Sequence, residues 1–291
     1  MIALLSALVT ACALLIPLQQ RAIDQASAHV ELDRAPDSAR VLQLSSSTNL
    51  SNYYLGGGQP GLALTPGQLD EETPVRIRQA FGRPVDGQYV DLTMPPTSPR
   101  AANGELAWRD GACAHLEMVN GRCPSGAREI AVSVADARNF DWAVGAVLKV
   151  EEVMPEGAPE APVGMALRVV GTYAVPPATY WETWTLTGRS GTKPDPAGGV
   201  LHDLWVTDRA TFMGAKTWRY PTTRVDLRLR PDVTGVDELL TLADRVAAHA
   251  RSQSKRSQNS AIVKVRSGLP DVAATVRKAQ HQARVTIPAL M

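Results

Sequence analysis

The first eighteen residues, Met1 to Leu18, constrain the fold of this chain more than any other stretch. The segment holds no charged side chain, and Ser6 and Thr10 carry its only hydroxyls. As a helix it would span about 27 Å, close to the roughly 30 Å hydrocarbon core of a bilayer. Within such a core every backbone polar group must bond inside the segment, so a helix is the expected conformation. The sequence therefore predicts a membrane anchor followed by one large aqueous domain.

Three other interpretations of this segment stay open. A secretory signal peptide is one, because residues 26–28 (ASA) resemble a cleavage site, although the usual basic start is absent. A lipoprotein signal is another, since residues 9–12 (VTAC) resemble a lipobox. A buried core helix is the third, because apolar segments of this length also occur in cores. Charge does not set the orientation in the membrane, since no Lys or Arg precedes the segment and Asp24 offsets Arg21.

The composition excludes some classes of protein and favours a mixed fold. The 291 residues carry Lys+Arg 30 against Asp+Glu 29, a formal net charge of +1, so nothing points to a nucleic acid as partner. Hydrophobic residues make up 44%, enough for a packed core, and 21 Pro with 22 Gly predict long loops. The fold class that follows is α+β and not a helix bundle.

Hydrophobic periodicity divides the chain into a membrane part, an α/β unit and a β-rich insertion. The predicted parts are a transmembrane helix at 1–20, the first part of an α/β subdomain at 21–94, a β-rich inserted subdomain at 95–223, the second part of the α/β subdomain at 224–268, and a stalk helix with the start of a second membrane helix at 269–291. The chain thus leaves a membrane, forms one exported domain and returns.

Local patterns predict the individual elements. Strands are expected at 39–44, 88–94, 105–108, 115–119, 129–134, 146–150, 167–173, 204–206, 224–229 and 262–265. Helices are expected at 19–33, at 69–81, behind a capping box of Thr234 and Asp237, and from Leu269 onward. The first helix is expected to place Ala22, Ala26 and Val30 on one face, and a polar turn is expected at 252–259.

Cys113 and Cys123 form a close pair in a polar stretch with Asn120-Gly121 between them. In an exported domain this pattern predicts a disulfide across a hairpin that turns at Asn-Gly. Such a small loop would stabilise the fold by about 2–3 kcal/mol. A metal site that adds His115 is an alternative, but it lacks a fourth ligand at a recognisable spacing. Two unpaired thiols are the other alternative.

Motifs for catalysis or nucleotide binding lack their structural context. Residues 56–61 (GGGQPG) fit G-x-G-x-x-G, but no strand leads into them and no helix follows to bind a pyrophosphate. Ser252 and Lys255 fit the S-x-x-K of acyl-transfer enzymes, but neither S-D-N nor K-T-G follows. We therefore expect no catalytic residue, no cofactor and no metal. A secreted serine hydrolase using Ser252 and Lys255 is a distant alternative.

One aromatic cluster stands out, with Tyr180, Trp181 and Trp184 within five residues. Such side chains can contact a lipid headgroup or a protein partner. The alternative is that they cover the end of the strand at 167–173. A surface role predicts that replacing both tryptophans weakens binding, and a core role predicts that it lowers stability.

Two stretches resemble a known family. Glu129–Val150 (EIAVSVADARNFDWAVGAVLKV) and Leu167–Tyr173 (LRVVGTY) repeat an order of strand, short helix, VG turn, strand and later VVG strand. In this they resemble FtsX-like ABC transporter permeases with a MacB-type periplasmic core domain. The cysteine pair followed by Pro124, and the closing residues 282–291 (QARVTIPALM), resemble the actinobacterial-type branch. The resemblance covers nearly the whole chain, on loose and mostly structural motifs.

The resemblance implies a permease subunit fragment in the plasma membrane, with the bulk of the chain extracytoplasmic, and not an enzyme. It implies a separate cytoplasmic ABC ATPase as partner, reached through parts of a full-length chain beyond Met291, and a homodimer or a paired permease. The subunit would couple that ATPase to export or to mechanical signalling at the cell envelope. A stand-alone membrane-anchored or secreted binding protein is the alternative.

Overall fold

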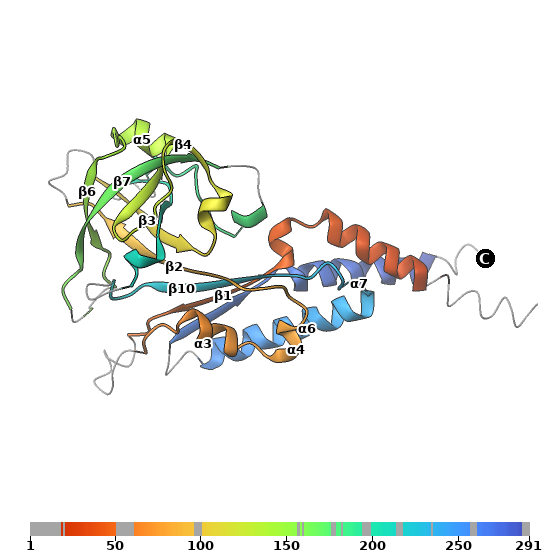
Figure 1. The fold of residues 1–291 in the computed structure, drawn as a ribbon. Coiled ribbons are helices and arrows are strands. Elements are labelled where there is room, and N and C mark those ends of the chain that lie inside the picture. The colour runs from red at the N-terminus through yellow and green to blue at the C-terminus, as the bar shows by residue number, and fades with distance from the viewer. Residues whose placement is uncertain are drawn as a thin grey trace, which may run out of the picture.

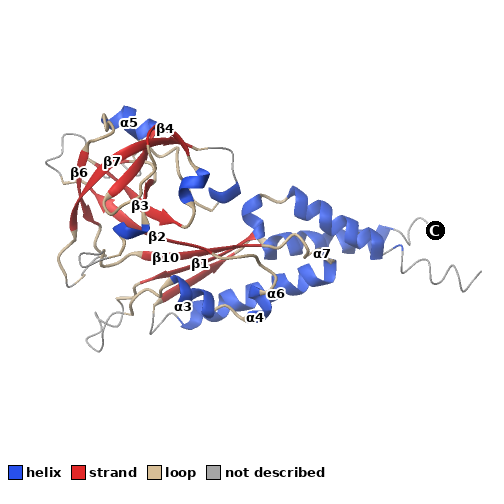
Figure 2. Ribbon diagram, in the orientation of Figure 1, coloured by secondary structure: helices blue, strands red, loops and turns tan. Residues whose placement is uncertain are grey.

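The computed structural model describes most of the chain outside the apolar N-terminal segment. The described residues are 19, 21–50, 61–95, 101–155, 158, 160–175, 179–181, 183–193, 199–213, 218–233, 235–256 and 261–286. The predicted anchor Met1–Leu18 lies outside them, so it stays a prediction. Within the described part, no helix combines the length and the apolarity that a membrane crossing needs. Helices and strands are both abundant there, which confirms the α+β fold class (Figure 2).

The strands form one sheet of eleven. Their bounds are β1 Val41–Ser47, β2 Val85–Thr93, β3 Ala102–Arg109, β4 Glu117–Gly121, β5 Glu129–Ser133, β6 Val147–Glu152, β7 Gly164–Ala174, β8 Val200–Leu201, β9 Trp205–Thr207, β10 Thr222–Arg228 and β11 Ile262–Arg266. The α-helices are one over 21–34, α3 Pro66–Glu71, α4 Val75–Arg78, α5 Val134–Phe140, α6 Val236–Arg256 and α7 Leu269–Thr286. Short 3₁₀ turns are η1 Asp37–Arg40, η2 Ala112–His115, η3 Thr179–Trp181 and η4 Arg209–Thr211.

Part of the sheet closes into a barrel. The order β11-β1-β10-β2 is antiparallel throughout, and β2 then continues through β6, β7, β5 and β9 to β3. Because β3 also pairs with β2, these six strands form a closed ring, which removes their free edges. The barrel occupies one end of the molecule, and α6 and α7 lie toward the other (Figure 1).

Two hydrophobic clusters fill these two regions. The first draws its residues from 28–81 and 225–276 and places β1 and β10 against α6 and α7. The second draws its residues from 90–218 and fills the barrel around Trp205, which is 0% exposed. We call the region of the first cluster the helix-covered sheet. One continuous sheet passes through both clusters, so the strands do not mark where one subdomain ends and the next begins. The subdomain boundaries predicted from the sequence therefore stay predictions.

The predicted helix at 69–81 is wrong, because the chain forms two short helices there. Thr65 caps α3 in a full capping box with Gln68, and α3 ends before Thr73. Pro74 then starts α4 as its N-cap. Proline lacks a backbone N–H and disfavours helical geometry in the residue before it, so one continuous helix cannot pass through Pro74.

The first helix, predicted at 19–33, spans 21–34, and the structure shows which of its faces is buried. Ala22, Ala26 and Val30 are exposed, and Val30 reaches 44%. Asp24 and Ala28 point inward instead, at 8% and 2% exposed. Ala28 belongs to the first hydrophobic cluster, so tertiary packing and not the distribution of apolar side chains chose the buried face.

α6 is longer than predicted. It continues to Arg256, where a turn had been expected from 252, and its buried face includes His249 and Gln253. Glu72 accepts a hydrogen bond from the Gln253 amide at 3.3 Å, so this polar residue is satisfied inside the packed face. The predicted capping box stays a prediction, because Thr234 lies outside the described residues.

Candidate functional site

Cys113 and Cys123 are joined in a disulfide, as predicted, with their Cα atoms 5.9 Å apart. The predicted hairpin is wrong. Gly121 lies within β4 at φ +69°, and β4 pairs with β7 across a bulge, so Asn120-Gly121 makes no turn. Since both sulfurs are in the disulfide, neither is free to bind a metal with His115. The described residues hold no cluster of three or more metal-ligating side chains.

The aromatic cluster lies in the core and not on the surface. Trp181 and Trp184 are 4% and 7% exposed and pack in a third hydrophobic cluster that also contains Tyr173. The burial of the two tryptophans agrees with the core alternative, and Tyr180 is half-buried. Contact of these three side chains with a lipid or a partner stays a prediction. We call residues 179–186, of which the structure describes all but 182, the aromatic strap.

Two arginines and one carboxylate meet beneath this strap. Arg109 ends β3 in the barrel, and Arg224 and Asp226 lie on β10 of the helix-covered sheet. Asp226 is 3% exposed and Arg109 is 7% exposed. Asp226 accepts hydrogen bonds from the guanidinium of Arg109, from Arg224 Nε at 3.2 Å and from Thr183 Oγ1 at 2.7 Å. We call Arg109, Arg224 and Asp226 the junction cluster.

Charge and aromatic faces keep the junction cluster ionised despite its burial. Burial alone would raise the pKa of Asp226, but the charges of Arg224 and Arg109 outweigh it and hold the pKa below its ordinary value. The guanidinium carbon of Arg109 lies 4.6 Å from the ring centroid of Tyr180, and that of Arg224 lies 4.4 Å from Trp184. These cation–π contacts replace part of the hydration that each cation loses.

The junction cluster therefore ties the barrel to the helix-covered sheet. Paired buried charges contribute little net stability, but removing one partner is costly because the other is then buried alone. Such a cluster specifies one arrangement of the strands that carry it. The two pockets lined by residues 31–39 with 268–275 and by residues 61–72 with 253–263 include no residue of the junction cluster.

Sequence reasoning missed a second buried polar cluster, formed by Ser133, Asp136, His202 and Asp203. Asp136 and Asp203 are both 0% exposed. Ser133 Oγ donates to Asp203 at 2.6 Å, and the backbone N–H of Asp203 donates to the Asp136 carboxylate at 3.1 Å. The S-x-x-D spacing of Ser133 and Asp136 is a visible helix-capping signal. The approach of Asp203, 67 positions away, has no local signal.

The environment of this second cluster shifts its acid–base properties. Burial raises the pKa of Asp136 to about 6, helped by the nearby charge of Asp203 and opposed by hydrogen bonds. Burial lowers the pKa of His202 to about 3, and the His202 ring stacks on Trp205 at 4.0 Å between centroids. Ser133 bonds a carboxylate and not the imidazole, so the described geometry does not form a serine–histidine nucleophile.

The remaining motifs assemble no site in the described residues. Ser252 and Lys255 are exposed on the last turns of α6. Gly61 forms a bridge with Asn49, and residues 56–60 of the glycine-rich loop lie outside the described residues.

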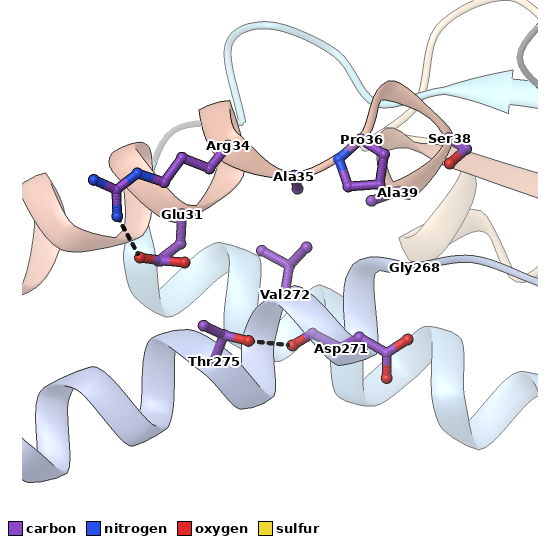
Figure 3. Close-up of a pocket in the computed structure, with 10 residues that line it drawn as sticks. All are labelled: Glu31, Arg34, Ala35, Pro36, Ser38, Ala39, Gly268, Asp271, Val272 and Thr275. Carbon is purple, nitrogen blue, oxygen red and sulfur yellow. Dashed lines mark hydrogen bonds and ion pairs between the residues drawn. The ribbon is translucent and has the colours of Figure 1, made fainter.

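A pocket of about 350 Å³ lies between the helix at 21–34 and α7 (Figure 3). Ala35, Ala39 and Val272 contribute apolar surface, and Glu31 and Asp271 contribute carboxylates. Much of its polar lining is already bonded internally. Arg34 pairs with Glu31 at 3.4 Å, and Thr275 Oγ1 donates to the backbone of Asp271 at 3.1 Å.

Neither a protein-family model nor a curated protein matches this chain. Among solved structures, the chain is similar to the periplasmic region of MacB from Actinobacillus actinomycetemcomitans, at a TM-score of 0.36 and 9% sequence identity. The match covers 82% of this chain and 94% of that chain. A TM-score this low does not establish a common fold, so these comparisons assign the chain to no family.

Proposed function

We propose that this chain is the extracytoplasmic domain and first membrane helix of an FtsX-like ABC transporter permease subunit in the plasma membrane. One observation carries the proposal. The helix at 21–34 and α7 lie side by side and run in opposite directions, so the start of the first helix and the end of α7 lie at the same end of the molecule (Figure 1). The apolar segment Met1–Leu18 and the closing stretch at 284–291 are attached at that end.

Contacts between these two helices support the proposal. Ala28 packs in the same hydrophobic cluster as Val272, Ala273 and Val276, and both helices line the pocket of Figure 3. Each helix joins the sheet through a short link, the first to β1 through η1 and α7 from β11 through residues 267–268. A displacement of the two helices would therefore reach the sheet directly.

The junction cluster gives this movement a route to the barrel. β10 pairs with β1 along six residue positions, and Asp226 on β10 bonds Arg109 at the end of β3. We propose that the domain transmits motion and catalyses no reaction. Its partners in this function are a separate cytoplasmic ABC ATPase and a second permease subunit, identical or paired.

Membrane fractionation tests the anchor on which the proposal depends. The full chain is expected in the membrane pellet after an alkaline wash, and a chain lacking residues 1–20 is expected in the supernatant. The double variant Leu8→Arg with Leu14→Arg keeps the length and is also expected in the supernatant, because charges at the bilayer centre are costly. Intact mass separates the alternatives: a mature chain that begins near residue 29 has lost a signal peptide, and that result contradicts the anchor.

The ATPase partnership needs its own test. The protein expressed from its own gene, cross-linked in cells and purified in detergent, is expected to retain an ABC ATPase. Repeated purification without any ATPase would refute the permease assignment even if the anchor were real.

A stand-alone anchored binding protein is the second candidate, and the pocket of Figure 3 is the observation that favours it. Its volume of about 350 Å³ is at the lower end for small-molecule sites. Replacing Ala39 by Leu would fill this pocket. If that substitution abolished the biological activity of the full chain while the fold stayed intact, the binding function would replace the mechanical one.

A further inference from the structure

We infer that the Cys113–Cys123 disulfide is a redox-sensitive device that sets how firmly the aromatic strap ties the barrel to the helix-covered sheet. The inference rests on the mechanical function proposed above, because it names the regulation of that same junction. The inference is based on a continuous series of contacts that runs from the disulfide to β10.

The first contact in the series is within η2. Cys113 and His115 belong to this single short turn, in which Ala114 N donates to Gly111 O at 3.0 Å. A 3₁₀ turn of four residues gains little stability from its own hydrogen bonds. The disulfide fixes η2 to Cys123, two residues after the end of β4, the strand that pairs with β7. The cross-link therefore attaches η2 to the barrel wall.

The next contacts join η2 to the aromatic strap. The His115 ring stacks on the Tyr180 ring, with 3.9 Å between centroids and 11° between planes. The backbone carbonyl of His115 accepts a hydrogen bond from Trp181 Nε1 at 2.6 Å. The Tyr180 hydroxyl donates to the carbonyl of Asp110. The strap is thus held against η2 by a ring stack and one side-chain donor, and against Asp110, just before η2, by a second donor.

The last contacts join the strap to the junction cluster. Arg109 Nη2 donates to the backbone carbonyl of Tyr180 at 3.1 Å. Thr183 Oγ1 and Trp184 Nε1 both donate to the Asp226 carboxylate, at 2.7 Å and 3.2 Å. Loosening the strap would therefore remove donors from Asp226 and an acceptor from Arg109, while the covalent path between barrel and sheet stays intact.

The chemistry is a thiol–disulfide exchange with a dithiol reductant. One thiolate of the reductant attacks the disulfide and forms a mixed disulfide, and its second thiol then displaces the chain. Cys113 and Cys123 leave as two thiols, the reductant leaves as its own disulfide, and two electrons and two protons pass to the chain. Cys113 is an exposed residue and Cys123 is half-buried, so the disulfide lies near the surface of the protein.

Hydrogen exchange tests the inference on the full chain in detergent, oxidised or treated with dithiothreitol. After reduction, backbone amides of the strap are expected to exchange about tenfold faster, because a local opening no longer works against the cross-link. The β10 amides near Asp226 are expected to follow to a smaller extent. Amides of α6, which packs in the first hydrophobic cluster, are expected to stay unchanged, and reoxidation is expected to restore the strap.

Three variants distinguish a specific effect of the disulfide on the strap from a general effect of the reductant on the protein. Cys113→Ser with Cys123→Ser is expected to reproduce the faster strap exchange. His115→Ala keeps the disulfide but removes the ring stack, and it is expected to loosen the strap in the same way. Glu129→Gln is the matched control. It removes the negative charge that pairs with Arg122 beside Cys123 without touching the strap, so strap exchange should not change.

Two outcomes would overturn the inference. One is unchanged strap exchange in a chain that mass spectrometry shows to be fully reduced. The other is an equal rise across β5, β9 and the strap, which would make the disulfide a general staple of the barrel. This measurement needs neither a membrane nor an ATPase. If fractionation found the full chain in the supernatant, the proposed function would be refuted, but the hydrogen-exchange result would still test whether the disulfide controls the strap.

Discussion

Arg109 and Asp226 lie 117 positions apart in the chain, yet the guanidinium of Arg109 donates a hydrogen bond to the Asp226 carboxylate inside a shell of aromatic rings. The two residues come from different hydrophobic regions, Arg109 from the barrel and Asp226 from the helix-covered sheet. The ladder between β10 and β2 already joins these regions, and the pairing of Arg109 with Asp226 adds a specific side-chain contact across the same boundary. The first prediction follows from this pair.

Asp226→Ala is expected to lower the free energy of unfolding by about 3–5 kcal/mol, because Arg109 and Arg224 would stay buried without their counter-charge. Urea denaturation followed by tryptophan fluorescence measures the change. Asp232→Ala is the matched control. It removes an equivalent carboxylate from Arg230 on the surface, where pairing contributes little, so it should leave the midpoint unchanged. Equal effects of the two substitutions would contradict the role of burial.

Trp181→Ala and Trp184→Ala are each expected to lower the free energy of unfolding by about 3–5 kcal/mol, since both indoles are buried in the third hydrophobic cluster. Val119→Ala, on an exposed position of β4, is the control and should have little effect. Thermal unfolding of purified variants gives the comparison. Normal stability with weakened binding to a membrane or partner would instead restore the surface role.

The buried Asp136 predicts a pH dependence of stability with a defined sign. Its pKa is about 6 in the folded protein against 3.8 ordinarily, so the folded state holds the proton more tightly. Stability from this group is therefore highest below about pH 4, falls as pH rises through 6, and stays reduced above that. Asp136→Asn is expected to flatten the decline between pH 4 and 6 in a series of urea titrations.

Glu129 provides a control of opposite sign for that experiment. Hydrogen bonds from Arg122 and from backbone N–H groups hold the pKa of Glu129 at about 2, against 4.5 ordinarily. Its stabilising contribution is present above about pH 4.5 and is lost as pH falls toward 2, so Glu129→Gln should alter only that lower window. A loss of the pH 4–6 decline in Glu129→Gln would show that Asp136 is not its source.

Gly104→Ala is expected to destabilise the barrel by about 1–3 kcal/mol through overpacking. A Cβ at Gly104 would lie 2.5–2.7 Å from three atoms of the His202 ring, which is itself buried against Trp205. Gly67→Ala in α3 meets nothing within 4 Å and should be neutral or stabilising by up to about 1 kcal/mol. Calorimetry of both variants checks the contrast, and a neutral Gly104→Ala would mean that the His202 ring can move aside.

Much of the local structure could be predicted from the sequence. The apolar and polar alternation of β2 and β10, the buried run of β7 and the amphipathic pattern of α6 all reflect the burial of one face of a regular element. The disulfide could also be predicted, because its two cysteines are only ten residues apart in the chain. These features depend on neighbours within a few residues, which is the range that a sequence pattern reports.

The errors and omissions have a common physical cause. Asp24 and Ala28 face inward although the first helix has larger apolar side chains elsewhere, because α7 and the sheet decide which face is covered. In the aromatic strap, Trp184 is buried against Arg109 and Asp226: its ring packs on the Arg109 guanidinium, and its Nε1 donates to the Asp226 carboxylate. The sequence of the strap itself contains no pattern that predicts contact with Arg109 or Asp226, because both are distant in the chain.

The sequence by itself determined every strand of the described sheet except β8, the long α6 and α7 helices, and an apolar start to the chain, since each depends on local periodicity and composition. Only the tertiary structure decided that β2 pairs with both β6 and β3 to close the barrel, that Asp136 meets Asp203, and that the junction cluster joins two cores. These contacts join residues far apart in the chain, and their free energy depends on burial that exists only once the whole fold has formed.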